Sequence, residues 1–508
     1  MLARSGDAVG AAAIVEPWVA VRHLLGDGLD ARTAALGAAL ASIEGAVGQD
    51  VDRVRASLEA GLSAAYMLDR RLGEAIEHGE RARALAREAG DLAVEVNAAT
   101  TLGAVFVFAG RMDEGWGLRD EAIERGRAAN LEAEVARAYR MAGTSASVLV
   151  EYDRAEAALR EGIDYARRVE LWNHQHYMSA HLAHVAWATG DWAVARRLAE
   201  HALADGRGGI TTRITCLHVL GYVALGTGDW PAAVGNLDEA RRLGEQMGEL
   251  QRLSPALWGL AETARLRGDH AESIRWSEAG VSASERVRDA AYAFPFLVTG
   301  ARSLLALGDP AAAGRWVERV AVDLRERSIP GTLPAIDHGR GLVLLAGGST
   351  GQARAALEAA AAGWRERRRT WEGTWALVDL ARCAHRSNQR VEAGRLASAA
   401  RDEGIRLGSP PVIAAADELL TAAGRRGQAS TEPWAPLTAR EFEVARLVAD
   451  GLTNGGIATE LTVAPKTVAA HVEHILAKLG VGRRSEIAAW VAARGVLHSR
   501  PHDGDREE

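Results

Sequence analysis

One predicted helix near the carboxyl end carries side chains whose types and spacing could recognise double-stranded DNA. The helix begins at Pro465, and one of its faces carries Lys466, Thr467, Ala470, Glu473, His474 and Ala477. Lys466 lies in the first turn, where a backbone phosphate also meets the free N–H groups of a helix. Ala470 could contact a thymine methyl group, and Glu473 could accept a hydrogen bond from cytosine N4. The alternative is a solvated face on an ordinary three-helix domain.

Three helical segments are predicted to position this face. Thr438 and Glu441 are spaced to form a capping box at the start of the first helix. Leu437 and Phe442 are placed to close a hydrophobic staple around that cap. A second short helix is predicted from Thr453 to about Leu461, and the third has proline at its first position, where the missing N–H has no partner anyway. The apolar residues of the third helix recur at helical spacing and are expected to form the core, at Val468, Val472, Ile475, Leu476 and Leu479. This is the layout of a helix-turn-helix.

Five short motifs follow one another along this stretch, at Leu437–Glu441, Gly451–Asn454, Ile457–Ala458, Thr467–Val472 and Lys478–Val481. Their order and spacing, over about sixty residues, resemble the LuxR-type DNA-binding domain of bacterial transcription regulators. The resemblance implies that the helix from Pro465 is the recognition helix and that a last helix, Ser485 to Arg494, helps to pair two copies. It implies a homodimer on promoter DNA, with contacts expected from Lys466, Thr467, Ala470, Glu473, His474, Lys478, Arg483 and Arg484.

The sequence departs from that family at several positions. Gly455 and Gly456 stand where the family usually has a basic and an acidic residue, and each glycine inside a helix costs about 0.8–1 kcal/mol relative to alanine. Ala464 replaces the usual serine cap, a loss of roughly 1 kcal/mol. Ala469 and Glu473 stand where many relatives carry basic groups. The glycines and Glu473 favour an alternative function, a protein-interaction scaffold whose helix-turn-helix no longer binds DNA.

The long first part of the chain repeats itself. A turn position recurs at intervals of 40 residues, with one interval of 38, at Arg70, Gly110, Val150, Gly190, Gly228, Gly268, Gly308, Gly348 and Asn388. Small residues recur seven positions before, five positions after and twelve positions after this turn, with Val320 as the exception. Small residues at fixed positions let helix backbones approach closely. The pattern therefore predicts an all-α fold in which about nine antiparallel helix pairs stack into a TPR-like α-superhelix.

No catalytic residue, metal site or cofactor is predicted in these repeats. Gly347–Gly351 matches the G-x-S-x-G elbow of hydrolases, but that motif needs a preceding strand and here it fills a turn between helices. His174, His181 and His184 share one side of a helix, with His176 nearby, so a metal or anion site is the alternative to packing histidines. Five tryptophans of the repeats are interpreted as packing between repeats: Trp192, Trp230, Trp258, Trp276 and Trp316. The alternative is that a minority of them line an inner groove and hold a ligand or peptide.

Composition narrows the class of protein. The 508 residues are 48% hydrophobic, without an apolar run long enough to cross a bilayer, and the amino-terminal residues do not form a clear signal peptide. Cys216 and Cys383 are the two cysteines, which indicates reduced cytoplasmic thiols rather than a disulfide framework. The net charge is −7, but residues 437–495 hold seven Lys/Arg against six Asp/Glu, and both lysines, Lys466 and Lys478, lie there.

The predicted domains are a TPR-like α-solenoid over residues 1–425, a linker over 426–436, a LuxR-type helix-turn-helix over 437–497 and a disordered tail over 498–508. The combination resembles the C-terminal part of MalT-like large ATP-binding LuxR regulators. Those regulators carry a nucleotide-binding domain, but no G-x-x-x-x-G-K occurs here, so no ATPase domain is expected. The predicted function is a cytoplasmic transcription regulator, not an enzyme, whose repeats sense a ligand or protein partner. The resemblance also allows RNA polymerase as a partner.

Overall fold

The computed structural model describes residues 7–425 and 437–493, and every regular element within these ranges is a helix. Backbone contacts divide the chain into two compact units, which we call the repeat unit, Met1–Leu420, and the C-terminal unit, Thr421–Glu508. The predicted all-α fold class is therefore confirmed. The predicted linker and the predicted disordered tail lie outside the described residues.

Two expectations from composition can be compared with the described residues. None of their helices is both long and apolar enough to cross a membrane. Cys216 and Cys383 are both buried and form no disulfide. Burial raises the pKa of the Cys216 thiol to about 12, so this side chain behaves as a packed apolar group rather than a reactive one.

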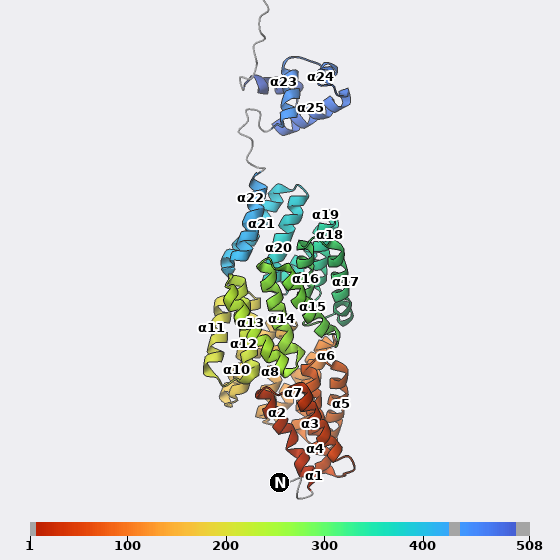
Figure 1. Ribbon diagram of the computed structural model, residues 1–508, viewed down its shortest axis with the longest axis vertical. Helices are drawn as coiled ribbons and strands as arrows, with labels where there is room; N and C mark the ends of the chain where they lie inside the picture. The colour runs from red at the N-terminus through yellow and green to blue at the C-terminus, as the bar shows by residue number, and fades with distance from the viewer. Residues whose placement is uncertain (1–6, 426–436, 494–508) are drawn as a thin grey trace, which may run out of the picture. The chain divides into compact units, whose positions relative to one another are not determined.

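The repeat unit is built from consecutive helix pairs (Figure 1). It begins with three short helices, α1 (Ala8–Ala13), α2 (Val15–Leu24) and α3 (Leu29–Ser42). From residue 49 to residue 407, all of which the structure describes, nine pairs follow: α4 (Gln49–Leu68) with α5 (Leu72–Glu88), α6 (Leu92–Phe108) with α7 (Met112–Ala128), α8 (Glu132–Val148) with α9 (Tyr152–Arg168), α10 (Trp172–Ala188) with α11 (Trp192–Asp205), α12 (Gly209–Thr227) with α13 (Trp230–Met247), α14 (Leu250–Leu266) with α15 (His270–Glu285), α16 (Phe294–Ala306) with α17 (Pro310–Arg327), α18 (Pro334–Ala346) with α19 (Thr350–Glu366), and α20 (Thr370–Arg386) with α21 (Arg390–Leu407). One further helix, α22 (Pro410–Arg425), follows the last pair. The predicted array of about nine repeats is confirmed.

The turn inside each repeat depends on one residue with a left-handed backbone. All nine predicted turn positions have positive φ, from 59° at Asn388 to 92° at Gly190. Most of them are glycine, which adopts this conformation without a steric penalty. After Gly190, the Asp191 side chain accepts a hydrogen bond from the Val194 N–H at 3.2 Å and caps α11. Glycine therefore ends one helix, and aspartate begins the next.

The recurring small residues lie where helices approach most closely. A Cβ atom on Gly115 of α7 would lie 2.6 Å from the carbonyl oxygen of Gly103 of α6, closer than real Cβ contacts. A Cβ atom on Gly221 of α12 would lie 2.5 Å from Cγ of Leu237 of α13. The 40-residue pattern of small residues therefore records the contact between the two helices of each pair.

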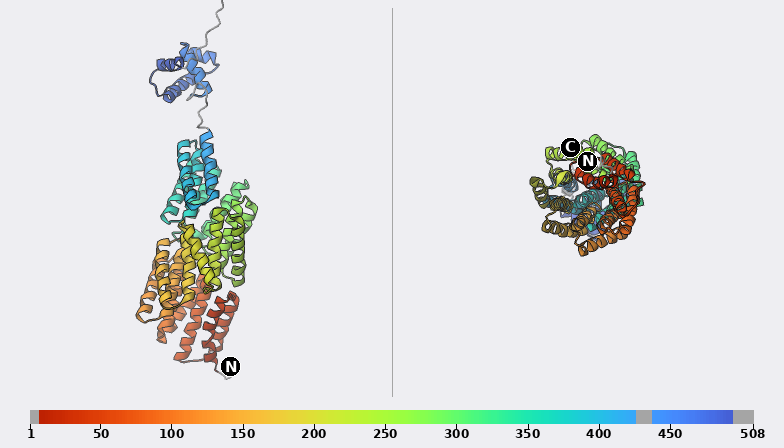
Figure 2. Two further views of the ribbon diagram at one scale, coloured as in Figure 1. Left: turned by 90° about the vertical axis from the view of Figure 1, so that its left-hand side faces the viewer. Right: turned by 90° about the horizontal axis from the view of Figure 1, so that it is seen from below.

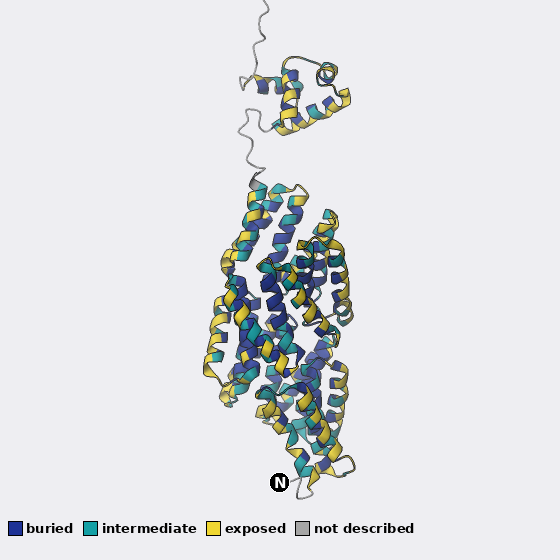
Figure 3. Cartoon of the chain, viewed as in Figure 1, coloured by how far each residue is buried: buried dark blue, intermediate teal, exposed yellow. Residues whose placement is uncertain are grey.

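The repeats wind tightly enough for successive superhelical turns to touch. The Arg369 guanidinium donates a hydrogen bond to the Tyr152 hydroxyl at 2.8 Å, across 217 residues of sequence. Arg70 likewise donates to the Tyr292 hydroxyl at 3.3 Å, across 222 residues. One superhelical turn thus takes between five and six repeats. Viewed along its axis, the repeat unit is a ring of helices (Figure 2), and its buried residues gather on the inside (Figure 3).

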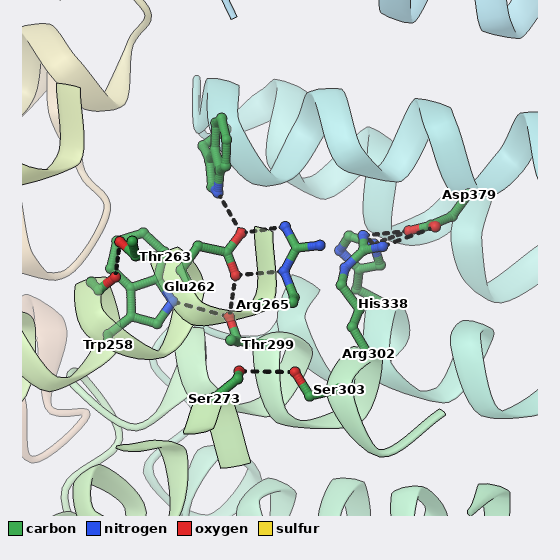
Figure 4. A network of polar contacts seen from close by, with 12 residues as sticks. Trp258, Glu262, Thr263, Arg265, Ser273, Thr299, Arg302, Ser303, His338 and Asp379 are labelled. Carbon is green, nitrogen blue, oxygen red and sulfur yellow. Dashed lines mark hydrogen bonds and ion pairs between the residues drawn. The ribbon is translucent and has the colours of Figure 1, made fainter. Parts of the chain in front are cut away.

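A buried network of charged side chains joins α14, α16, α18 and α20 (Figure 4). Asp379 of α20 accepts hydrogen bonds from Arg302 of α16 at 3.0 Å and from His338 Nε2 of α18 at 2.9 Å. Glu262 of α14 is held by the Arg265 guanidinium at 2.6 and 2.8 Å. Because both carboxylates are ion-paired as well as hydrogen-bonded, their burial is tolerated, and the network fixes these repeats against one another.

Candidate nucleic-acid interface

The C-terminal unit begins with the capped helix that the sequence predicts. Helix α23 spans Ala439–Ala449, and its N-cap is Thr438. The Thr438 hydroxyl accepts a hydrogen bond from the Glu441 N–H at 3.2 Å, and the Thr438 N–H donates to the Glu441 carboxylate at 2.8 Å. Leu437 and Phe442 are both buried in the core of this unit. The capping box is confirmed, and it fixes the start of the helix that supports the next two.

Helices α24 (Asn454–Glu460) and α25 (Pro465–Leu479) form the helix-turn-helix. Thr453 caps α24 by accepting a hydrogen bond from the Gly456 N–H at 3.2 Å. In the turn, Thr462 has a positive φ of 52°, the left-handed conformation that redirects the chain. Because Thr453 is the N-cap, the second predicted helix starts one residue later than expected, at Asn454. The third helix starts at Pro465, as expected.

One face of α25 packs on the core of the unit. Of the predicted core residues, Val468, Val472 and Ile475 are buried, and Leu479 is half-buried at the edge. The last described helix, α26, spans Arg484–Ala492, against an expected span of 485–494. Its contacts with α23 complete the small core, on which α25 packs with its apolar side.

The opposite face of α25 is exposed, as the sequence predicts. The exposed side chains are Lys466, Thr467, Ala470, Glu473, His474 and Ala477. Lys466 forms no ion pair within the described part of the chain. The N-cap residue, Ala464, has no side chain that could bond the first N–H groups, so this helix end is open to an anion. The alanines keep this face narrow enough for a major groove.

Lys478 is exposed, but its ammonium is ion-paired within the unit. Its ammonium lies 2.7 and 2.6 Å from the two carboxylate oxygens of Glu441. Burial disfavours the Glu441 carboxylate, but hydrogen bonds from Lys478 and Thr438 outweigh it and hold the pKa of Glu441 below its ordinary value. Lys478 therefore ties the end of α25 to the cap of α23, and in this state it is not available to a phosphate.

The side chain of Arg484 is hydrogen-bonded within the unit, whereas that of Arg483 is exposed. The Arg484 guanidinium donates to the Asn454 side-chain oxygen at 2.7 Å and to the Leu452 carbonyl at 2.5 Å, which joins α26 to the start of α24. Arg483 is exposed, and its backbone N–H donates to Glu486 at 2.7 Å. Of the four cations expected to contact DNA, Lys478 is ion-paired and Arg484 is hydrogen-bonded to neutral oxygens, whereas the Lys466 and Arg483 side chains form no ion pair within residues 437–493.

Sequence reasoning missed Arg440. Its guanidinium donates to the carbonyl of Leu461, the first residue after α24, at 3.1 Å and to Glu443 at 2.6 Å. A cation is disfavoured in the first turn of a helix, because that end of the helix carries partial positive charge. An arginine in the first turn of α23 therefore indicated that its side chain makes a contact outside its own helix. This arginine holds the turn between α24 and α25.

The structure places the G-x-S-x-G match and the four candidate histidines of the repeat unit in separate surroundings. The G-x-S-x-G match lies in the turn between α18 and α19, with Ser349 at the start of α19 and no strand before it. His176 Nε2 lies 3.3 Å from a carboxylate oxygen of Asp205, and His174 lines a cavity beside α2 and α8. His181 and His184 line an internal cavity. Among the described residues, no three His, Cys, Asp or Glu side chains are grouped so as to hold a metal ion.

The tryptophans follow both of the interpretations given to them. Trp192, Trp258 and Trp316 are buried, whereas Trp230 and Trp276 are half-buried. Trp258 also lines the internal cavity, so it belongs to the minority expected on the inside of the superhelix.

Comparison with known proteins identifies the domain. Residues 435–491 match the family described as bacterial regulatory proteins, luxR family. Over 62 residues the chain is 45% identical to the HTH-type transcriptional regulator Mb0914c of Mycobacterium bovis, a match that covers 12% of this chain and 7% of that protein. Over 68 residues it is 38% identical to the oxygen regulatory protein NreC of Staphylococcus aureus, covering 13% of this chain and 31% of NreC. The C-terminal unit thus carries a LuxR-type helix-turn-helix, while the similarity spans a small part of each relative.

Two solved structures resemble the chain over a longer stretch but at a low level. A Rap protein complexed with competence and sporulation factor has a TM-score of 0.43 at 12% identity, covering 69% of this chain and 97% of that one. The apo form of the quorum sensor NprR from B. thuringiensis has a TM-score of 0.38 at 12% identity, covering 70% of this chain and 96% of that one. At these scores the likeness carries no argument about what the repeat unit binds.

Proposed function

We propose that this protein is a cytoplasmic transcription regulator whose residues 437–497 bind promoter DNA through α25. Residues 1–425 sense a ligand or protein partner and control that binding. The LuxR-type domain supports this proposal, because the relatives that share it are transcription regulators. Contact with RNA polymerase is the proposed route from DNA binding to transcription.

The observation that carries the proposal is the open face of α25. Its exposed residues are slim or polar, Lys466 lies in the first turn, and no side chain caps the helix start. A phosphate at this end would be met by a cation and by free N–H groups together. Phosphate contacts by Lys466 and Arg483 supply most of the proposed affinity. DNA shape supplies part of the proposed specificity, because few side chains on this face could read a base edge.

A homodimer on a two-fold symmetric operator is the proposed assembly, with half-sites about one helical turn apart. On α26, Ile487 and Val491 are buried, whereas Ala489 and Ala492 are exposed. Small exposed side chains allow a second helix to pack closely. Analytical ultracentrifugation on a selected duplex tests this arrangement: we expect two chains per duplex, and one chain per duplex would contradict it.

Selection of bound fragments from random duplex DNA by the whole chain tests the proposed function. We expect enrichment of a two-fold symmetric sequence and an affinity for it that falls as salt rises, since phosphate contacts release counterions. Fluorescence anisotropy at several salt concentrations measures that slope. No enrichment, together with no salt-dependent affinity for any duplex, would count against DNA binding.

A protein-interaction scaffold is the second candidate. The engagement of Lys478 by Glu441 and of Arg484 by Asn454 favours it, because it leaves fewer cations for phosphate. A folded chain that binds no duplex but retains a protein partner would support the scaffold instead.

A further inference from the structure

Two adjoining cavities, which we call the joined cavities, lie inside the ring of helices that forms the repeat unit. The N-terminal cavity, of about 320 Å³, is bounded by α2, α4, α8, α10 and α14. The central cavity, of about 90 Å³, lies further along the axis and is lined by aromatic side chains. Met141, Thr144, Tyr177, Gln251 and Arg252 line both, so the cavities adjoin. The two cavities are therefore neighbours, and residues from most of one superhelical turn bound them.

The N-terminal cavity holds two arginines without a carboxylate partner. Arg137 and Arg140 lie one helical turn apart on α8, and neither forms an ion pair with any described residue. Arg137 donates to the Asn97 carbonyl at 3.1 Å and to the Thr101 hydroxyl at 2.8 Å. The Nε atom of Arg140 is buried and has no hydrogen-bond partner among the described residues. Burial lowers the pKa of Arg137 to about 10, so its guanidinium stays charged at neutral pH.

The other charges around this cavity do not cancel the pair. Arg32 and Arg252 share a single carboxylate, Glu249, and are therefore already engaged. Glu16 and Glu134 also line the cavity and attract Arg137, which offsets part of the positive charge, but neither forms an ion pair with a described residue. Burial raises the pKa of Glu16, which disfavours its charged form. Two adjacent, half-buried guanidinium groups remain without an ion pair, an arrangement that is costly unless an anion joins them.

The central cavity joins aromatic walls to polar atoms that lack partners. The rings of Tyr222 and Trp258 meet edge to face at 5.0 Å. The hydroxyls of Ser145 and Ser254, which are 2% and 1% exposed, have no hydrogen-bond partner among the described residues. The same holds for Nε2 of His218, which is 6% exposed. An unpaired buried polar group destabilises the folded chain, and a ligand with matching polar atoms would remove that cost.

We propose that the joined cavities bind a small organic anion with a flat apolar body. Its acidic group lies between Arg137 and Arg140, and its body extends toward Tyr222 and Trp258, where Ser145 and Ser254 bond its polar substituents. A carboxylate or a phosphate satisfies the arginine pair, because both accept two hydrogen bonds from one guanidinium. The space suits a small molecule rather than a peptide, since it lies at the lower end of small-ligand pockets. This proposal rests on the sensory role proposed for the repeat unit, and it names the chemical class of the ligand.

Isothermal titration calorimetry of the whole chain with three naphthalene derivatives tests it. The probes are 2-naphthoate, 2-naphthyl phosphate and the neutral 2-naphthamide. We expect saturable binding of at least one anion, at least tenfold tighter than the amide, and the tighter of the two anions identifies the acidic group. This comparison needs no variant, so it decides the charge preference even if a substitution unfolds the chain.

Substitution of the arginines locates the site. We expect Arg140→Gln to weaken anion binding about tenfold or more and Arg140→Lys to weaken it less, because lysine keeps the charge but loses the paired donors. Arg196→Gln is the matched control, since Arg196 is an exposed arginine on α11 of the same unit. Circular dichroism verifies that each variant is folded. Binding that Arg140→Gln and Arg137→Gln both leave unchanged would overturn the proposal.

Two further outcomes would also overturn it. One is the absence of saturable binding by either anion up to about 10 mM, a concentration that would detect even millimolar affinity. The other is binding of a hexaglutamate peptide by a chain that binds neither naphthyl anion, which would identify an acidic peptide as the ligand. DNA binding, measured separately without probe, distinguishes the two proposals. Lost anion binding with intact DNA binding counts against this inference alone, and the reverse result counts against the proposed function alone.

Discussion

The two lysines of this chain lie on the same helix, α25, and have different roles. Lys466 is exposed in the first turn and forms no ion pair within the described residues, so its ammonium can meet a phosphate. Lys478 is held by both carboxylate oxygens of Glu441 and stabilises the unit itself. The difference comes from position along the helix, because the last turn of α25 lies beside the cap of α23 and the first turn does not.

Replacement of Lys466 tests its role in DNA binding. We expect Lys466→Ala to weaken binding to all duplexes by a similar factor and to reduce the slope of log affinity against log salt by about one unit. Fluorescence anisotropy titrations at several salt concentrations measure this slope. Arg196→Ala, an equal loss of charge in the repeat unit, should leave the slope unchanged. A slope that Lys466→Ala does not alter would exclude a phosphate contact by this residue.

The pair of Glu441 and Lys478 makes the stability of the C-terminal unit depend on pH. The folded pKa of Glu441 lies below its ordinary value of 4.5, so the carboxylate binds fewer protons in the folded state than in the unfolded state. Its contribution is therefore fully present above pH 4.5 and is lost as the pH falls through the folded pKa. Melting of the 430–508 fragment, followed by circular dichroism between pH 7 and about pH 3, measures this loss.

Glu441→Gln should lower the melting temperature at neutral pH and flatten its dependence on acid pH. The matched control is Glu443→Gln, because Glu443 is an exposed carboxylate on the same helix that pairs with Arg440. We expect a much smaller change for this variant, since exposed ion pairs contribute little. Equal effects of the two substitutions would argue against a special role for the Glu441 cap.

At the scale of the element, α24 is the weakest helix of the C-terminal unit. It has seven residues, of which Gly455 and Gly456 are two. Neither glycine has a positive φ, and a Cβ atom on Gly455 would come no closer than 3.8 Å to the Thr453 hydroxyl. The backbone of α24 therefore does not require glycine at these positions. By contrast, Gly451 ahead of this helix has a φ of 82°, in the left-handed region.

The two kinds of glycine should respond to alanine in opposite directions. We expect Gly455→Ala to raise the free energy of unfolding of the 430–508 fragment by about 0.5–1 kcal/mol, because alanine loses less backbone entropy in a helix. We expect Gly451→Ala to lower it by about 1–2 kcal/mol, the cost of a left-handed alanine. Urea denaturation measures both. A destabilising Gly455→Ala would mean that the space around α24 is smaller than the structure indicates.

At the scale of the whole molecule, the winding of the repeats decides what the repeat unit can bind. Residues about 217 positions apart touch, so the superhelix closes on itself instead of leaving an open concave groove. From α6 onward, the first helix of each pair has more than half of its residues buried. Polar side chains of several of these helices line the internal cavities. A tightly wound superhelix therefore favours a small enclosed ligand, whereas an open one would favour an extended peptide.

The contact between superhelical turns should contribute measurably to stability. Tyr152→Phe removes the hydroxyl that accepts a hydrogen bond from the buried Arg369 guanidinium, and we expect a loss of roughly 1.5–3 kcal/mol, as for hydrogen bonds to charged groups. Tyr165→Phe is the matched control on the same helix, since Tyr165 is half-buried and its hydroxyl makes no hydrogen bond with the described residues. Urea denaturation of the whole chain compares the two. Equal midpoints would show that the turns are not coupled through this contact.

The sequence alone determined the features that depend on near neighbours. The first helix of each pair ends at a residue with a left-handed backbone, so Gly190 and the equivalent residues of the other repeats indicated the turns. The recurring small residues indicated the close contact between the two helices of each pair. The capping box at Thr438 and the exposed face of α25 followed from spacing along single helices. These rules act within one helix pair, over about twenty residues, which is why a single sequence expresses them.

Only the tertiary structure decided which distant residues meet. The superhelical turn is the sum of small rotations over several repeats, and no local pattern encodes that sum. The contact of Arg369 with Tyr152, the engagement of Lys478 by Glu441 and the unpaired arginines Arg137 and Arg140 all depend on it or on similar long-range packing. The sequence therefore predicted the helices and their faces, while packing decided which of their charges remain available for a partner.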